Sequence, residues 1–184
     1  MKNKLRIIGG DWRSRQLNFV DAPGLRPTPA RVRETLFNWL QYEIAGKQCL
    51  DLYAGSGALG FEAASRGAKL VVQVEINASA CKCLKENAIA LAADQIKIVP
   101  NEVMLYLSGA GHQAFDIAFL DPPFGQQLVI KTCQLLEKND WLTRNAKIYI
   151  ETEREFEFFE LPENWKQLKS KSAGEVGYHL FERC

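Results

Sequence analysis

Short apolar segments alternate with amphipathic ones from Cys49 onward, and this alternation constrains the fold more than any other feature. The predicted strands span residues 49–53, 69–75, 96–99, 115–120 and 146–151, and the predicted helices between them span 58–66, 78–91, 102–107 and 128–138. Such alternation specifies a mainly parallel sheet with helices on both faces. It then stops, and residues 165–171 and 176–182, separated by a turn at Gly174, predict an antiparallel hairpin. We therefore expect an α/β fold with a seven-stranded, mainly parallel sheet.

A smaller part precedes the alternating region. Residues 4–20, interrupted by Gly9 and Gly10, are typical of a β-ribbon. With 184 residues, the chain is long enough for one globular domain with a substantial core. We expect residues 1–27 to form a basic ribbon extension and residues 28–184 to form the main domain.

A helix is predicted directly after the ribbon. Thr28 is a good N-cap, and Pro29 suits the first helical position. Gly46 predicts the end of the helix. Between these ends an apolar stripe recurs at helical spacing: Val32, Leu36, Trp39, Leu40 and Ile44.

The net charge of +1 conceals an asymmetry. Residues 1–37 carry eight basic and three acidic residues, a net charge of +5, which leaves −4 for the rest of the chain. The acidic stretch 151–160 predicts a solvated connection. A basic end on an otherwise acidic chain predicts a polyanionic partner at that end. A solvated basic face without a partner is the alternative.

Other classes are excluded by what the chain lacks. No apolar stretch approaches the ~18 residues that a membrane span needs, and the N-terminus does not lead into a signal-peptide core. The five cysteines are odd in number and form no CxxC pair, which predicts free thiols in a reducing compartment. Cys81 and Cys83 could contribute to a metal site only with His112 or His179, and we expect no metal. We expect a cytoplasmic monomer.

The tetrapeptide Asp121-Pro122-Pro123-Phe124 directly follows the predicted strand 115–120. Proline fixes φ and has no N–H, so the carbonyl oxygens at this turn stay free as acceptors. The carboxylate adds further acceptors, and the phenyl ring adds a stacking face. An exocyclic amino group of a base offers two N–H donors beside a π-face, which is the complement of this set. The tetrapeptide therefore predicts a site for a nucleobase amine.

A glycine-rich turn, Gly55-x-Gly57-x-x-Gly60, opens the first helix of the alternating region, and Glu75 ends the second strand. The glycines allow a ligand to approach the positive end of the helix, and the carboxylate can accept both hydroxyls of a ribose. This pattern fits either NAD or S-adenosylmethionine. Asp51 favours S-adenosylmethionine, because a carboxylate repels a pyrophosphate but attracts a sulfonium or an α-ammonium group. We expect Asp51, Gly55, Gly57 and Glu75 to bind this cofactor.

Two polar residues follow the third strand of this region. Asn101 or Glu102 could recognise the amino group of adenine, and the sequence does not choose between them. The alternative is that Asn101 only caps the following helical turn.

The predicted chemistry is methyl transfer from the sulfonium to an exocyclic nitrogen, an in-line displacement that depends on positioning. The nitrogen's lone pair is delocalised into the ring. Hydrogen bonds to the Asp121 carboxylate and the Pro122 carbonyl would draw the nitrogen towards tetrahedral geometry. Asp121 can then take the proton that the methylated nitrogen must lose, while Phe124 stacks on the base.

The chain resembles the RsmD family of bacterial 16S rRNA guanine-N2 methyltransferases over nearly its whole length. Residues 6–15 (RIIGGDWRSR) and 26–40 (RPTPARVRETLFNWL) carry the specific part of the resemblance. Residues 51–60 and 121–124 are shared by many amino-methyltransferases and indicate only the class.

The resemblance implies a Rossmann-like class I S-adenosylmethionine-dependent methyltransferase fold. It also implies one target, the guanine at position 966 of 16S rRNA, in an assembled or late-assembly small ribosomal subunit. In this interpretation the basic end contacts rRNA phosphates through Arg13, Arg15, Arg26 and Arg33.

Other functions are weighed against this one. DNA adenine-N6 or cytosine-N4 methyltransferases and a protein glutamine methyltransferase share the tetrapeptide pattern. The chain leaves no room for a domain that reads DNA sequence, and aspartate rather than asparagine at Asp121 disfavours the glutamine enzyme. An NAD oxidoreductase would need a hydride site, in which neither His112 nor His179 is placed. A non-catalytic RNA-binding module would leave Asp51, Glu75 and Asp121 unexplained.

Overall fold

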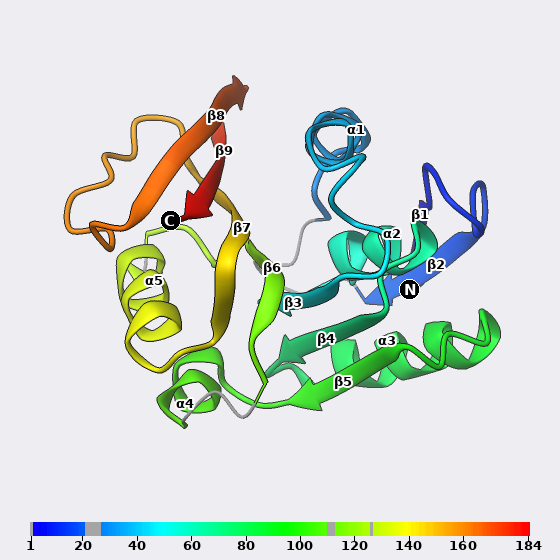
Figure 1. The fold of residues 1–184 in the computed structure, drawn as a ribbon. Coiled ribbons are helices and arrows are strands. Elements are labelled where there is room, and N and C mark those ends of the chain that lie inside the picture. The colour runs from blue at the N-terminus through cyan, green and yellow to red at the C-terminus, as the bar shows by residue number, and fades with distance from the viewer. Residues whose placement is uncertain (1, 21–26, 110–112, 126) are drawn as a thin grey trace.

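A computed structural model describes the chain except for residues 1, 21–26, 110–112 and 126 (Figure 1). Its elements are, in chain order, β1 (Lys2–Arg6), β2 (Gln16–Val20), α1 (Ala30–Trp39), β3 (Gln48–Leu52), α2 (Ala58–Ser65), β4 (Leu70–Glu75), α3 (Ala78–Ala90), β5 (Ile96–Pro100), α4 (Val103–Ser108), β6 (Phe115–Leu120), α5 (Leu128–Lys138), β7 (Leu142–Glu153), β8 (Trp165–Ala173) and β9 (Val176–Arg183).

The main sheet has seven strands in the order β5-β4-β3-β6-β7-β9-β8. Strands β3 to β7 pair in parallel, and β9 is antiparallel to both β7 and β8. Strands β1 and β2 form a separate antiparallel pair. The predicted fold is confirmed, including the C-terminal hairpin at the end of the sheet (Figure 1).

Each face of the sheet has its own apolar core. Because side chains alternate along a strand, Cys49 in β3 faces one core while Leu50 and Leu52 face the other. The first core lies under α1, α2, α3 and the ribbon, and the second lies under α4 and α5. In Figure 1 the two groups of helices lie on different sides of the molecule. Both faces are therefore covered, as a parallel sheet requires.

The N-terminal ribbon is docked on the first core. Its buried apolar side chains belong to the same cluster as those of the main sheet: Leu5, Ile7, Leu17 and Phe19. The buried Glu62 carboxylate of α2 accepts the N–H groups of Ile8 and Gly9 at 2.9 and 2.8 Å. Asn87 of α3 both donates to and accepts from the backbone of Asn18. The ribbon thus packs as part of the globule, and a domain boundary near residue 27 stays a prediction.

Two predictions for α1 are wrong. Pro29 occupies the N-cap position without a side-chain hydrogen bond, and the Thr28 hydroxyl donates elsewhere, as described below. The helix ends at Trp39 rather than near Gly46. Short turns continue the chain, with N–H groups bonded three residues back, so that Ile44 still reaches the core. The apolar stripe predicted the buried face of the helix correctly, but the helix is shorter than predicted.

The acidic stretch after residue 150 is only partly a solvated connection. Strand β7 continues to Glu153, and Glu151 is 3% exposed. The prediction is therefore wrong for the first residues of the stretch, because they pair with β9.

No helix in the described parts of the chain is long and apolar enough to cross a membrane. Among the same residues, no three His, Cys, Asp or Glu side chains form a group that could hold a metal ion. The five cysteines all lie within the described residues, none of them is in a disulfide, and only Cys184 is exposed.

Candidate active site

Acidic side chains gather on one face of the sheet, at the carboxyl ends of four adjacent strands. In the strand register Asp51 pairs with Phe119, and Phe119 pairs with Tyr149. Since side chains alternate, Asp121 and Glu151 lie side by side on that same face, two residues further along. The complete row, from β4 to β7, is Glu75, Asp51, Asp121 and Glu151.

Asp51 lies beneath the first turn of α2. Its Oδ2 accepts the Gly60 N–H at 3.0 Å and the Gln73 amide at 2.9 Å. Burial raises the pKa of Asp51 to about 7 against the effect of these hydrogen bonds, and the nearby Glu75 charge adds to the increase. A cation bound nearby would stabilise the ionised carboxylate.

Glu75 holds the glycine turn in place. Its two carboxylate oxygens accept the N–H groups of Gly55 and Asn77, each at 2.7 Å. Gly55 and Gly57 have φ values of +55° and +78°, a left-handed conformation that favours glycine. Because a carboxylate has about four lone-pair positions, Glu75 can still accept hydroxyl groups from a ligand.

Glu102, and not Asn101, is the N-cap of α4. Its two carboxylate oxygens accept the N–H groups of Met104 at 2.9 Å and Leu105 at 2.7 Å. Asn101 accepts the Glu102 N–H through its side-chain oxygen at 2.8 Å. The alternative that Asn101 caps this helix is therefore wrong.

Asp121 follows β6 and lies next to a second acid. The Thr28 hydroxyl is 2.9 Å from Glu151 Oε1 and 3.5 Å from Asp121 Oδ2. Burial, followed by the charges of Glu151 and Asp51, raises the pKa of Asp121 well above its usual range. The pKa of Glu151 is also raised by burial, although hydrogen bonds from Tyr149 and Thr28 oppose the increase. By the strand register, Asp121 lies on the same face of the sheet as Asp51 and Glu75.

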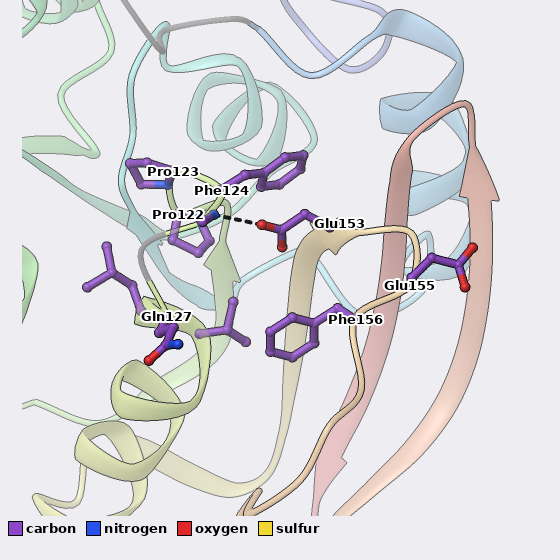
Figure 2. A pocket seen from close by; sticks show the side chains of 10 residues that line it. Pro122, Pro123, Phe124, Gln127, Glu153, Glu155 and Phe156 are labelled. Atoms are coloured by element: carbon purple, nitrogen blue, oxygen red, sulfur yellow. Dashed lines mark hydrogen bonds between the residues drawn. The ribbon is translucent and has the colours of Figure 1, made fainter.

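A pocket of about 370 Å³ opens beside the tetrapeptide. Its walls include Pro122, Pro123, Phe124, Glu153 and Phe156 (Figure 2). Phe124 is 44% exposed, which leaves its ring available for stacking. Glu153 accepts the N–H of Gly125 at 2.6 Å and so fastens the loop that carries Phe124 to the end of β7.

The sequence did not predict the positions of several residues in this region. Thr28 seemed to be a helix cap, and Glu151 seemed to belong to a solvated stretch. The alternation of β7 was the available signal, since Glu151 lies two residues after the buried Tyr149. Ile76, which directly follows Glu75, is a large apolar side chain that is 69% exposed.

Of the predicted RNA-contacting arginines that the structure describes, Arg13 and Arg15 are exposed and Arg33 is buried. Arg33 is 4% exposed, and its guanidinium donates to the backbone oxygens of Thr28 and Arg6, at 3.1 Å each, and lies 3.6 Å from Glu62. The expectation that Arg33 contacts RNA is therefore wrong: its guanidinium is buried and bonds to groups of the protein itself. Arg26 lies outside the described residues.

Arg13 and Arg15 lie together in the turn between β1 and β2. Their turn is bonded to Ser65 at the end of α2, and Arg15 donates to the Ala90 oxygen at the end of α3. Both helices begin at the carboxyl edge of the sheet and return to the opposite edge. The basic turn is therefore at the edge opposite Asp121.

This fold and this site define a class. An open sheet in this strand order, with a glycine turn after β3 and acids at the following strand ends, is the Rossmann-like fold of S-adenosylmethionine-dependent methyltransferases. The family model described as "Conserved hypothetical protein 95" matches residues 5–182, and the chain belongs to this family, the RsmD family.

Individual relatives agree with the assignment. The "Ribosomal RNA small subunit methyltransferase D" of Escherichia coli (strain K12) is 46% identical over 98% of this chain and 90% of its own length. The protein of the same name from Haemophilus influenzae is 44% identical over 98% of this chain and 95% of its own. Among solved structures, a "putative methyltransferase yhhF from Escherichia coli" superposes with a TM-score of 0.93, at 42% identity and 98% coverage of both chains.

Proposed function

We propose that this protein transfers a methyl group from S-adenosylmethionine to the exocyclic N2 of one guanine in small-subunit ribosomal RNA. One observation carries the chemistry: Asp121 directly follows β6 on the face of the sheet that also carries Asp51 and Glu75, and Pro122 and the exposed ring of Phe124 come next in the chain. The names of the relatives, which state ribosomal RNA small subunit methylation, support the substrate.

The donor set fits S-adenosylmethionine better than NAD. Asp51 and Glu75 are both acidic and buried, and they would repel a pyrophosphate. S-adenosylmethionine supplies a methyl group on a positively charged sulfur. Glu75 would accept the ribose hydroxyls, the Gly55–Gly57 turn would approach the cofactor closely, and Asp51 would favour the cationic end. Asn101 or Glu102 would contact adenine, and the exposed Ile76 would cover its ring.

The side of the site that would hold the methyl-accepting base offers groups suited to an amine. The Asp121 carboxylate and the Pro122 carbonyl would accept the two N–H groups, and Phe124 would stack on the base. The pKa of Asp121 is raised, so its carboxylate is a stronger base than that of an ordinary aspartate. It can therefore take the proton that the methylated nitrogen releases. We expect the substrate to be an assembled or late small subunit and the enzyme to act as a cytoplasmic monomer.

The test is transfer of labelled methyl groups to small subunits that lack this modification, followed by mass spectrometry of the rRNA to locate the label. We expect Asp121→Ala to lower transfer at least about 100-fold, because it removes a hydrogen-bond acceptor and a base. The Kd for S-adenosylmethionine should change less than about threefold, because Asp121 lies on the acceptor side.

The matched control is Asp116→Ala. Asp116 is on the same strand, at its opposite end, where it accepts the Gln48 N–H at 2.9 Å. This variant should transfer methyl groups at nearly the wild-type rate. Activity of Asp121→Ala equal to wild type, or labelling of a position other than a guanine N2, would overturn the proposal. Tight binding of NAD instead of S-adenosylmethionine would do the same.

A further inference from the structure

The Thr28 hydroxyl stands between two acids that belong to neighbouring strand ends. It donates to Glu151 Oε1 at 2.9 Å and lies 3.5 Å from Asp121 Oδ2. Glu151 Oε1 also accepts the Tyr149 hydroxyl at 2.9 Å. Thr28 is 6% exposed and Glu151 is 3% exposed, so these contacts are largely shielded from solvent.

The position of Thr28 is fixed from the opposite side. Its backbone oxygen accepts the Nε–H of the buried Arg33 at 3.1 Å. Arg33 is held in turn by the Arg6 backbone and by the Glu62 charge. The hydroxyl is thus held rigidly where the chain enters α1, although it contributes nothing to the cap of that helix.

We propose that Thr28 and Glu151 form a proton path behind Asp121, in which the Thr28 hydroxyl passes the proton received by Asp121 to the Glu151 carboxylate. Both residues act through Asp121 and are positioning residues in this sense. The inference rests on the proposed function, in which Asp121 accepts the proton of the methylated amine.

The step is balanced. The amine nitrogen forms its bond to the methyl carbon with its lone pair, and the carbon–sulfur pair stays on sulfur. The nitrogen then loses a proton to Asp121. The Asp121 carboxyl donates this proton to Thr28 Oγ1 while the Thr28 proton moves to Glu151 Oε1. Asp121 is again a carboxylate, Thr28 is again a hydroxyl, and the buried Glu151 holds the proton. After the product leaves, the same path returns the proton to the half-buried Asp121, which releases it to solvent.

The charges around Asp121 are suited to such a path. The groups that face it are Asp51 from β3, Glu151 and Tyr149 from β7, and the Thr28 hydroxyl. Asp51 and Glu151 are buried and Asp121 is half-buried. Neighbouring carboxylates in such surroundings do not all ionise easily, so a proton arriving at Asp121 is readily held by the pair that Asp121 forms with Glu151.

The first experiment compares Thr28→Val with Thr28→Ser. Valine has nearly the shape of threonine but no hydroxyl, whereas serine keeps the hydroxyl. We expect Thr28→Val to lower kcat by about tenfold or more, with the Kd for S-adenosylmethionine unchanged, and Thr28→Ser to recover most of the rate. Thr35→Val in α1 is the control, because its exposed hydroxyl donates only to the Arg31 backbone oxygen.

The second readout is the pH dependence of kcat, whose acid limb should shift in opposite directions in two variants. The negative charge of Glu151 opposes ionisation of Asp121, so Glu151→Gln should lower the pKa of Asp121 and move the acid limb of kcat to lower pH. The Thr28 hydrogen bond favours the ionised form, so Thr28→Val should raise that pKa and move the acid limb to higher pH. NMR titration of the Asp121 carboxyl carbon in the free protein measures the same shifts without any turnover.

The outcomes are separable. Opposite shifts of the acid limb with a lower kcat in both variants support the proton path. Wild-type kcat and an unchanged pH profile in Thr28→Val would overturn it, even if Asp121→Ala is inactive. If Thr28→Val unfolds, which thermal unfolding reveals, the NMR titration of Glu151→Gln still decides. A carboxyl pKa of Asp121 equal to that of the wild type in this variant contradicts the inference. Activity of Asp121→Ala would instead reject the proposed function.

Discussion

Gly60 lies in the first turn of α2, where its missing side chain allows Asp51 and Gln73 to approach the helix. A Cβ atom at this position would lie 2.7 Å from Asp51 Oδ2 and 2.5 Å from Gln73 Nε2. Both side chains are buried and bonded to each other, so neither can move away freely. Close approach of a carboxylate, rather than an unusual φ, explains the glycine here.

We therefore expect Gly60→Ala to damage the cofactor site. Alanine favours a helix by about 1 kcal/mol over glycine, but a steric clash in a packed interior costs about 1–3 kcal/mol and would displace Asp51. The Kd for S-adenosylmethionine, measured by calorimetry, should rise about tenfold or more. Gly109→Ala is the control, because among the described residues a Cβ there meets only the Tyr106 oxygen, at 3.7 Å. Unchanged affinity of Gly60→Ala would show that Asp51 does not shape the cofactor site.

At the scale of elements, the ribbon is attached to α2 and α3 by side chains that bond to its backbone. Asn87 accepts the Asn18 N–H at 3.0 Å and donates to the Asn18 oxygen at 2.7 Å. Because β2 has no strand of the main sheet beside it, these bonds take the place of a sheet neighbour. Glu62 holds the other end of the ribbon in the same way.

Asn87→Ala should loosen the ribbon without changing the catalytic edge. Loss of two hydrogen bonds of about 0.5–1.5 kcal/mol each should lower the free energy of unfolding, measured in urea, by about 1–3 kcal/mol. Hydrogen exchange at the Asn18 amide should accelerate, while exchange in β6 should not. Asn38→Ala, on the exposed face of α1, serves as the matched control. Equal protection of Asn18 in the variant would contradict this role of Asn87.

The elements themselves were predictable because apolar spacing depends on local geometry alone. Strand β6 and helix α5 begin and end where the sequence predicts. The start of α1 at Ala30, after an N-cap at Pro29, was not predictable. A threonine before a proline normally caps a helix, whereas here Glu151, 123 residues away, accepts the Thr28 hydroxyl. Arg33 was misjudged for the same reason, since only the fold reveals that Glu62 and two backbone oxygens surround it.

At the scale of the whole molecule, the basic turn that carries Arg13 and Arg15 and the edge that carries Asp121 lie at opposite ends of the sheet. A chain of this length has a radius of gyration of about 16 Å, so RNA that reaches both ends must extend well beyond the target base. Arg13 and Arg15 would then add affinity through phosphates remote from the methylated guanine. Their contribution should appear in binding rather than in the chemical step.

Reversing both charges, Arg13→Glu with Arg15→Glu, should therefore raise the Kd and KM for the small subunit and leave kcat unchanged. The effect should be larger at low salt, and the slope of log K against log salt should fall by about 1.4, because two phosphate contacts on single-stranded RNA are lost. Lys138→Glu with Arg144→Glu makes the same change of charge at the exposed end of α5 and in β7, outside the ribbon. If the two double variants had equal effects, the basic turn would act only through the net charge of the protein. A lower kcat would contradict the prediction in another way, because it would mean that the turn lies close to the target base.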